Sequence, residues 1–392
     1  MRRSSGVICL SAMLCTATAW AQLGIGRPQP HVGPPLTSPP VTFIYVANTP
    51  SNSSNYEIRG YAADANGQLT AISGSPFQED VTDLTGNGKH LFGSNRNGID
   101  IDAYTIESNG ALRYAAATDI VQGKNCDTAS VLFLDRTGTS LYNLDYDGND
   151  CANTTYQAFA VNQTTAKPTY LNEAGDTPEL TSALSFVGSN QFGYVASCYH
   201  FLPMIAGFVR ASNGGLKKLS TAPAPPVAPA NENYCPNLTA TDQTNHVAIA
   251  MQPMEGYGMT AGPYQLATYT ASSTGALTTA STSANMPSVL VGNLTAMSMA
   301  PSGKLLAVAG TSGMQVFHFN GANPITKDTG LLASAEIDEI AWDNDNHLYA
   351  LSRTAGKLFV FTVTATGESE APGSPYAVVN PSSLAVEAIP VS

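Results

Sequence analysis

A short strand–turn–strand–turn–strand pattern repeats along this chain and constrains its fold more than any other feature. The clearest copy is Leu294–Phe319, in which three short apolar runs are separated by two turns rich in Gly, Pro and Ser. Such runs predict successive antiparallel strands. The pattern recurs about every 45–55 residues, which is the spacing of β-propeller blades.

Six copies are marked by the turn between their first and second strands. These turns are Thr85–Gly88, Asp135–Gly138, Gly188–Asn190, Asp242–Asn245, Pro301–Gly303 and Asp343–Asn346. A seventh copy is split, because Ser382–Ala388 has the pattern of a first strand and Thr42–Asn48 that of a second strand. Pairing these two segments closes a ring and removes its exposed sheet edges. We therefore predict an all-β fold, a seven-bladed β-propeller of four-stranded blades.

A second repeated element is Gly-x-Leu. We expect it where the third strand of a blade turns into its outermost fourth strand, since glycine permits the tight turn. The five copies begin at Gly67, Gly110, Gly214, Gly275 and Gly330.

The first 40 residues have a different character and are not expected to belong to the ring. Met1–Arg3 is basic, Val7–Leu14 is apolar, and Ala19–Ala21 supplies the small residues of a signal-peptidase site, so residues 1–21 are interpreted as a signal peptide. Residues 22–40 are proline-rich and predict a spacer, and residues 41–392 are interpreted as the propeller domain. The apolar run is too short to span a bilayer. We expect an exported protein, periplasmic or extracellular, with no membrane span.

The charge of the chain argues against nucleic-acid binding. The formal net charge is −12 and only 12% of the residues are charged, so no basic surface is expected.

The cysteines beyond the signal peptide are Cys126, Cys151, Cys198 and Cys235. An even number in an exported chain favours two disulfides. Three pairings are possible, and the blade assignment chooses between them. It places Cys126 and Cys151 on one face of one blade, and Cys198 and Cys235 on that same face of the next two blades. We predict the pairs Cys126–Cys151 and Cys198–Cys235.

An acidic segment follows one predicted second strand. Asp145, Asp147 and Asn149 place oxygen ligands at alternate positions beside Gly148, which makes them a weak candidate for a calcium site. The segment lacks the full order of a calcium loop, and Asp and Asn beside Gly also form ordinary turns. We favour a solvated turn and expect no metal and no cofactor.

Three histidines, His90, His246 and His347, occupy the same repeat position just after the first turn. Their recurrence predicts a structural role in the hairpin, such as bonding a turn carbonyl. His200 is the histidine that falls in a loop on the expected ligand-binding face.

Several motifs resemble those of lactonase-type seven-bladed propellers, which include 6-phosphogluconolactonase-like enzymes. They are Tyr45–Asn48, the Gly-x-Leu turns, Gly74-Ser75-Pro76 and Gly373-Ser374-Pro375. The resemblance covers nearly all of the domain and implies a propeller fold. It says little about activity, because fold does not carry function with it.

The catalytic set that the resemblance implies is missing from this chain. The family's His-Pro-His element aligns with Thr128-Ala129-Ser130, and its Arg-His pair aligns with Ser182-Ala183. The family's Asp-Leu-Gly aligns with Asp145-Tyr146-Asp147, which keeps only the Asp, and its glutamate aligns with Cys198. Lactone hydrolysis needs a base or an activated water and a cationic group, and of the family's set only the aspartate, Asp145, is kept at these positions.

Two hypotheses for the function are therefore carried forward, beside a purely structural envelope role. The favoured one is a monomeric, non-catalytic scaffold that binds an unknown small molecule, glycan or protein on its loop face. The alternative is a divergent lactonase. The candidate ligand-binding residues are Tyr146, Tyr199, His200 and Tyr257, because loops rich in Tyr, Asn, Gly and Ser suit adaptable recognition.

Overall fold

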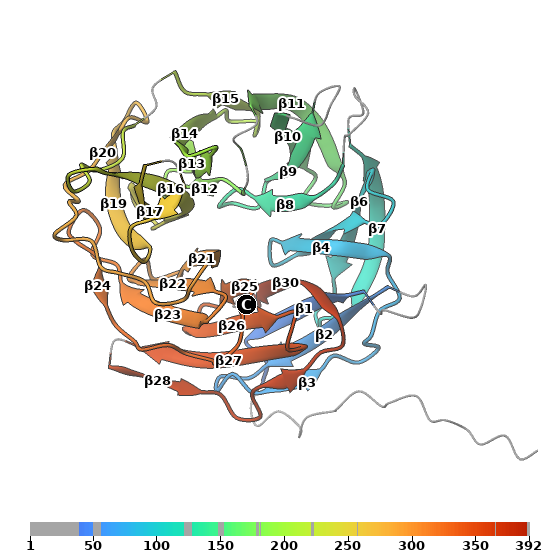
Figure 1. The fold of residues 1–392 in the computed structure, drawn as a ribbon. Helices are drawn as coiled ribbons and strands as arrows, with labels where there is room; N and C mark the ends of the chain where they lie inside the picture. Colours follow the sequence, from blue (N-terminus) through green and yellow to red (C-terminus); the bar gives the residue numbers. More distant parts are fainter. Residues whose placement is uncertain are drawn as a thin grey trace, which may run out of the picture.

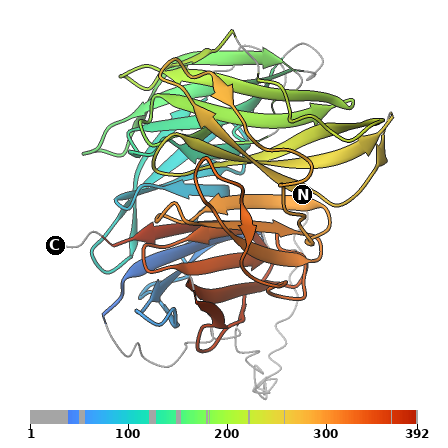
Figure 2. The same cartoon turned by 90° about the vertical axis from the view of Figure 1, so that its left-hand side faces the viewer.

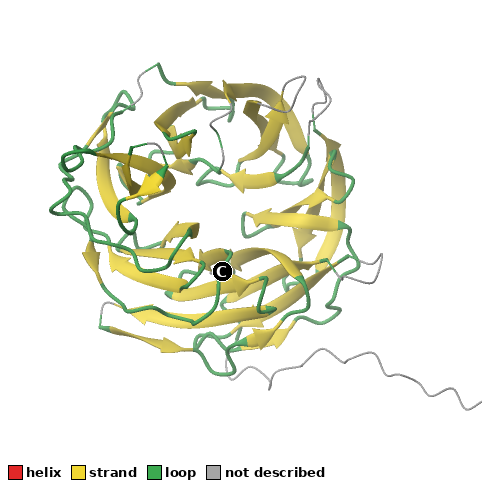
Figure 3. Cartoon of the chain, in the orientation of Figure 1, coloured by secondary structure: helices red, strands yellow, loops and turns green. Residues whose placement is uncertain are grey.

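The computed structural model describes residues 39–49, 56–120, 128–147, 153–177, 180, 182–220, 223–256, 258–364 and 366–389. They form seven antiparallel sheets, each built on a path of four strands and arranged as blades around one axis (Figure 1). This part of the chain consists of strands and loops (Figure 3). Within it, no helix is long and apolar enough to cross a membrane. The predicted seven-bladed β-propeller is confirmed.

The strands are given blade by blade, from the axis outward. Blade 1 contains β30 (Pro381–Ala388), β1 (Thr42–Asn48), β2 (Glu57–Ala63) and β3 (Leu69–Ala71). Blade 2 contains β4 (Val81–Gly86), β5 (His90–Asn95), β6 (Asp100–Ile106) and β7 (Leu112–Asp119). Blade 3 contains β8 (Val131–Leu134), β9 (Ser140–Asp147), β10 (Asn153–Val161) and β11 (Pro168–Thr177). Blade 4 contains β12 (Ser185–Phe186), β13 (Phe192–Tyr199), β14 (Leu202–Arg210) and β15 (Leu216–Lys218).

The remaining three blades include two accessory strands. Blade 5 contains β16 (Glu232–Thr241), β17 (His246–Glu255), β19 (Gln265–Ala271) and β20 (Leu277–Thr278), with β18 (Met259–Thr260) paired to β17. Blade 6 contains β21 (Leu294–Met299), β22 (Leu305–Gly310), β23 (Gly313–His318) and β24 (Thr326–Lys327). Blade 7 contains β25 (Glu339–Trp342), β26 (His347–Ser352), β27 (Lys357–Thr364) and β28 (Gly367–Glu370), with β29 (Tyr376–Ala377) paired to β27.

Blade 1 closes the ring from both ends of the domain, as predicted. β1 pairs antiparallel with β30, with Thr42 opposite Ala388 and Val46 opposite Leu384. Val46 and Leu384 belong to one buried cluster with Tyr349 of blade 7. The closing strand is therefore held by a hydrogen-bonded ladder and by packing against the neighbouring blade.

The apolar runs form strands because each blade is covered on both faces by its neighbours. All six residues of β22 are buried, as are all six of β26. A strand buried on both faces reads as a continuous apolar run rather than an alternating one. The core therefore lies between blades, as in the shared cluster of blades 6 and 7.

The Gly-x-Leu turns behave as predicted in four of their five copies. Gly67, Gly110, Gly214 and Gly275 all have positive φ and lie between third and fourth strands. Gly330 was assigned wrongly: it lies after β24, the fourth strand of its blade. Leu332, two residues later, forms an isolated bridge to Met314 of β23 instead of following a turn.

The two faces of the ring follow from the topology. We call the face that carries the second-to-third strand connections and the links between blades the loop face. The opposite face, which carries the first-to-second and third-to-fourth turns, is the turn face. In Figure 2 the β17–β18 hairpin projects on the loop face, at the right.

Candidate functional site

A disulfide cross-links the loop face between blades 4 and 5. Cys198, near the end of β13, is bonded to Cys235, and their Cα atoms are 5.2 Å apart. This confirms the predicted pair, although Cys235 lies inside β16 rather than before it. Cys126 and Cys151 lie outside the described residues, so the second pair stays a prediction. The bond holds the loop-face end of β13 against the neighbouring blade.

The β13–β14 hairpin carries two of the predicted ligand-binding residues, Tyr199 and His200. His200 and Phe201 form its turn with φ values of 48° and 63°, the left-handed conformations that the preferred two-residue hairpin turn requires. The centroids of the Tyr199 and His200 rings are 4.2 Å apart, and Tyr199 is 40% exposed. Of the other two candidates, Tyr146 lies in β9 and Tyr257 lies outside the described residues. Their proposed roles stay predictions.

Exposed apolar side chains extend this hairpin tip into a patch that sequence reasoning missed. We call Tyr199, Phe201, Leu202 and Met259 the rim patch. Phe201, Leu202 and Met259 are 42%, 59% and 65% exposed. A Cβ on Gly258 would lie 2.8 Å from the Phe201 ring, so that ring packs on the backbone of the neighbouring hairpin. The rim patch is thus assembled from blades 4 and 5 together.

The positions that align with the imidazoles of lactonase-type propellers hold no acid–base group. The Thr128 N–H donates to Asp145 Oδ1 at 2.7 Å. The Ser130 hydroxyl donates to the Leu144 carbonyl at 2.5 Å, and Asn143 Nδ2 donates to the Thr128 carbonyl at 3.0 Å. These bonds tie the segment before β8 to β9. Their role is to hold the blade together.

The Asp145 carboxylate is also used within blade 3. Asp145 is buried, and its second oxygen accepts a hydrogen bond from Gln157 Nε2 at 2.9 Å. Asn149 lies outside the described residues, as does the Asp147 side chain, so the calcium interpretation stays untested. In the described ranges no three His, Cys, Asp or Glu side chains are placed to hold a metal ion together.

The other aligned positions are likewise occupied by structural groups. The Ser182 carbonyl accepts the Tyr156 hydroxyl at 2.7 Å, and Ala183 packs against the apolar cluster of blades 3 and 4. Cys198 forms the disulfide with Cys235. No guanidinium or carboxylate replaces the expected groups at these three positions.

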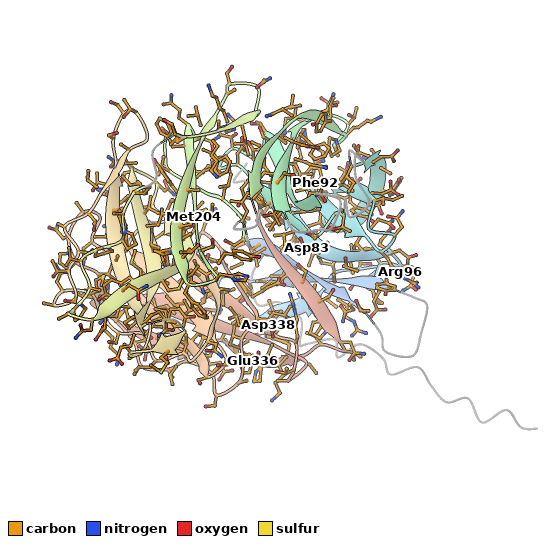
Figure 4. The ribbon with its side chains drawn as sticks, turned by 45° about the horizontal axis from the view of Figure 1, so that its top comes forward. Asp83, Phe92, Arg96, Met204, Glu336 and Asp338 are labelled. Atoms are coloured by element: carbon orange, nitrogen blue, oxygen red, sulfur yellow. A yellow bond between two sulfur atoms is a disulfide. The ribbon has the colours of Figure 1, made fainter. Side chains whose placement is uncertain are left out.

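A network of carboxyl groups that the sequence did not reveal joins the innermost strands of four successive blades. The Leu384 N–H donates to Glu339 Oε2 at 2.7 Å, which links β25 to β30. Ser383 Oγ lies 3.0 Å from Asp83 Oδ1 and 3.2 Å from Glu339 Oε2. The Leu132 N–H donates to Asp83 Oδ2 at 2.8 Å, which links β4 to β8. Figure 4 shows Asp83 toward the middle of the ring.

The electrostatics of this network favour the protonated form of its buried carboxyl groups. Burial and the nearby Glu339 carboxylate raise the pKa of Asp83 to about 7. Burial also raises the pKa of Glu339, and the ion pair with Arg353 only partly offsets the burial. A hydroxyl has one proton to donate, so Ser383 cannot donate to both carboxylates at once. Protonation of Asp83, whose pKa is near neutral, supplies the hydrogen-bond donor that the network lacks.

The recurring histidines are structural, as predicted; His90 bonds the expected turn carbonyl, whereas His246 and His347 bond aspartates instead. His246 and His347 each bond the aspartate four residues earlier, with 2.8 and 2.7 Å between His Nδ1 and Asp Oδ2. His90 lies 3.2 Å from the carbonyl of Gln163, in a turn of blade 3. The imidazoles therefore brace turns on the turn face.

Comparison with known proteins supports the fold. No protein-family model and no curated protein matches this chain. A putative 6-phosphogluconolactonase from Bacteroides fragilis NCTC 9343 is 12% identical, with a TM-score of 0.65 over 90% of this chain and 99% of that one. A putative 6-phosphogluconolactonase from Bacteroides uniformis ATCC 8492 is 11% identical, with a TM-score of 0.66 over 89% and 100%. The periplasmic gluconolactonase of Pseudomonas aeruginosa is 13% identical, with a TM-score of 0.64 over 89% and 100%. The chain resembles lactonase-type propellers, and at these identities the likeness shows the fold alone.

Proposed function

We propose that this chain is an exported, monomeric, non-catalytic propeller that binds a protein partner through the rim patch. The observation that carries the proposal is an exposed apolar patch on two hairpins that a disulfide between blades holds in place. Export is supported by that disulfide, which is typical of oxidising compartments, and by the signal-like residues 1–21.

The composition and rigidity of the rim patch suit binding to the surface of another protein. Aromatic residues and Met are enriched in the cores of protein interfaces, and the patch combines Tyr199, Phe201, Leu202 and Met259. A turn fixed in the left-handed region and a neighbouring disulfide reduce the conformational entropy lost on binding. Leu202 and Met259, the two most exposed members, offer aliphatic surface rather than the hydrogen-bonding groups that a glycan requires.

The alternative is a divergent lactonase, and one observation favours it. Asp83 lies close to the axis of the ring, and its pKa, raised to about 7, is near the value that suits a general acid at neutral pH. Against this, both of its oxygens are already hydrogen-bonded, to the Leu132 N–H and to Ser383 Oγ, and these bonds join neighbouring blades. The binding function therefore fits the structure better.

The experiment is cross-linking capture of exported proteins from the native host by the purified chain. We compare wild type with the double variant Leu202→Asp and Met259→Asp, and with Leu331→Asp as the matched control. Leu331 is also an exposed apolar residue, at 46%, but it lies in blade 6. The proposal is supported if wild type and the control capture a partner that the double variant does not capture. That partner, once purified, must also bind wild type directly. Capture that does not depend on the rim patch refutes it.

A further inference from the structure

Arg136 extends from the turn face of blade 3 toward blades 4 and 5. It is the second residue of the β8–β9 turn, and its Nη1 donates to the Asp242 carbonyl at 2.9 Å and to the Phe186 carbonyl at 3.2 Å. A longer contact of 3.5 Å reaches Thr241 Oγ1. These acceptors are neutral, and the guanidinium forms no ion pair with any carboxylate in the described part of the chain. Burial lowers the pKa of Arg136, and the Asp242 carboxylate partly offsets this at longer range. That carboxylate is itself bonded to His246 Nδ1 and Thr244 Oγ1, so the guanidinium is a fixed cation with no partner at ion-pair distance.

Two hollows near the axis of the ring share Arg136 as a lining residue. The channel hollow, of about 230 Å³, is lined by residues of the first strands of blades 3 to 6. The mouth hollow, of about 490 Å³, is lined by turn-face residues of blades 1, 2, 3 and 7. Leu134, Met297 and Met299 supply apolar wall to the channel hollow. The guanidinium thus borders both a polar opening and an apolar interior.

The carboxyl groups that line the mouth hollow are already compensated. Asp135 pairs with Arg210 at 2.5 Å, and Asp343 pairs with the imidazole of His347 at 2.7 Å. Burial raises the pKa of Glu387 to about 8, so this side chain carries a proton at neutral pH. None of the three lies at ion-pair distance from the guanidinium, so its charge stays available at the turn-face end of the channel.

We propose that Arg136 anchors a binding site for a small molecule that bears a carboxylate or phosphate group. The planar guanidinium has five N–H donors in a fork that matches such oxyanions. The carbonyls of blades 4 and 5 use only Nη1, and they hold the group in one orientation. The carbon skeleton of the ligand would lie against Leu134, Met297 and Met299. This site is on the turn face and is separate from the rim patch.

The test is isothermal titration calorimetry at neutral pH and constant ionic strength, with inorganic phosphate and hexanoate as separate probes. We expect saturable binding of at least one probe, and the stronger probe identifies the preferred oxyanion. Arg136→Gln should weaken that binding by at least about tenfold. Arg113→Gln, which removes an exposed arginine paired with Glu107 on blade 2, should leave it unchanged. Absence of saturable binding to wild type, or equal affinity in Arg136→Gln, overturns the proposal.

A folding defect is separated from a binding defect with a second variant. Arg136→Lys keeps the positive charge but loses the planar fork. If Arg136→Gln does not unfold cooperatively, the comparison is made with Arg136→Lys, for which we expect binding weakened several-fold. Affinity equal to that of wild type would then overturn the proposal.

Discussion

Glu387 lies where the closing blade meets blade 2, and we predict that its ionisation governs part of the pH dependence of stability. The side chain is only 4% exposed, and Gly88 N–H donates to Oε2 at 2.5 Å. Burial raises its pKa from the usual 4.5 to about 8. Because the folded-state pKa is the higher one, this group contributes its full stability below pH 4.5 and loses it as the pH rises through 8.

The size of the effect follows from the two pKa values. Each unit of difference is worth 1.36 kcal/mol, so the free energy of unfolding should fall by about 4 kcal/mol between about pH 5 and pH 9. A folded domain of about 350 residues unfolds with an entropy that converts this to roughly 5 °C in Tm.

The assay is differential scanning calorimetry of wild type and Glu387→Gln across that pH range at constant ionic strength. Glutamine stays neutral at every pH. The Tm of Glu387→Gln minus that of wild type should therefore increase by roughly 5 °C from the acid to the alkaline end of the range. Glu368→Gln, at an exposed position in β28, serves as the control and should show no such trend. A constant Tm difference between wild type and Glu387→Gln over the range would refute the reasoning.

Three further predictions concern the ring itself. Gly86→Ala should destabilise the fold by about 2 kcal/mol or more in a denaturant titration, because the added Cβ would lie 2.0 Å from Oε1 of the buried Glu387 side chain. Gly330→Ala should be near neutral in the same titration, because nothing lies within 4 Å of the added Cβ. Deleting Asn380–Ser392 removes the partner of β1 and should yield an aggregating, protease-sensitive product; a truncated chain that melts as cooperatively and as hot as the intact one would contradict the closure. Replacing Cys198 and Cys235 by Ser should cost about 3 kcal/mol in chemical denaturation, and unchanged stability would argue against the cross-link.

The architecture was predictable because each blade repeats a local pattern. The split seventh copy predicted the pairing of β1 with β30. The C-terminal segment matches a first strand that lacks a second, and the N-terminal segment matches the missing second strand. The prediction for Gly330 was wrong because the Gly-x-Leu pattern does not show which strand precedes the glycine. In blade 6 the third-to-fourth turn uses Gly321, with a φ of 63°, and no leucine follows that glycine.

The candidate sites were less predictable because they depend on contacts between blades. Ser383 and Asp83 are separated by 300 positions in the sequence, yet their oxygens lie 3.0 Å apart. Leu202 begins the nine-residue strand β14 and Met259 begins the two-residue strand β18, and neither segment has a sequence feature that indicates exposure at a rim. Arg136 reads as an ordinary turn residue, and only the ring geometry brings its guanidinium to the carbonyls of blades 4 and 5.

The most direct test of the central claim, that this lactonase-like propeller binds rather than catalyses, is lactone turnover by the purified chain. The substrates are sugar and muconate-type lactones, with an active lactonase propeller as the positive control. We predict rates equal to uncatalysed hydrolysis, because Thr128, Ser130 and Cys198 cannot replace imidazole and carboxylate groups. Turnover above that background by wild type, abolished in Asp83→Asn or His200→Ala, would contradict the account and establish a divergent lactonase.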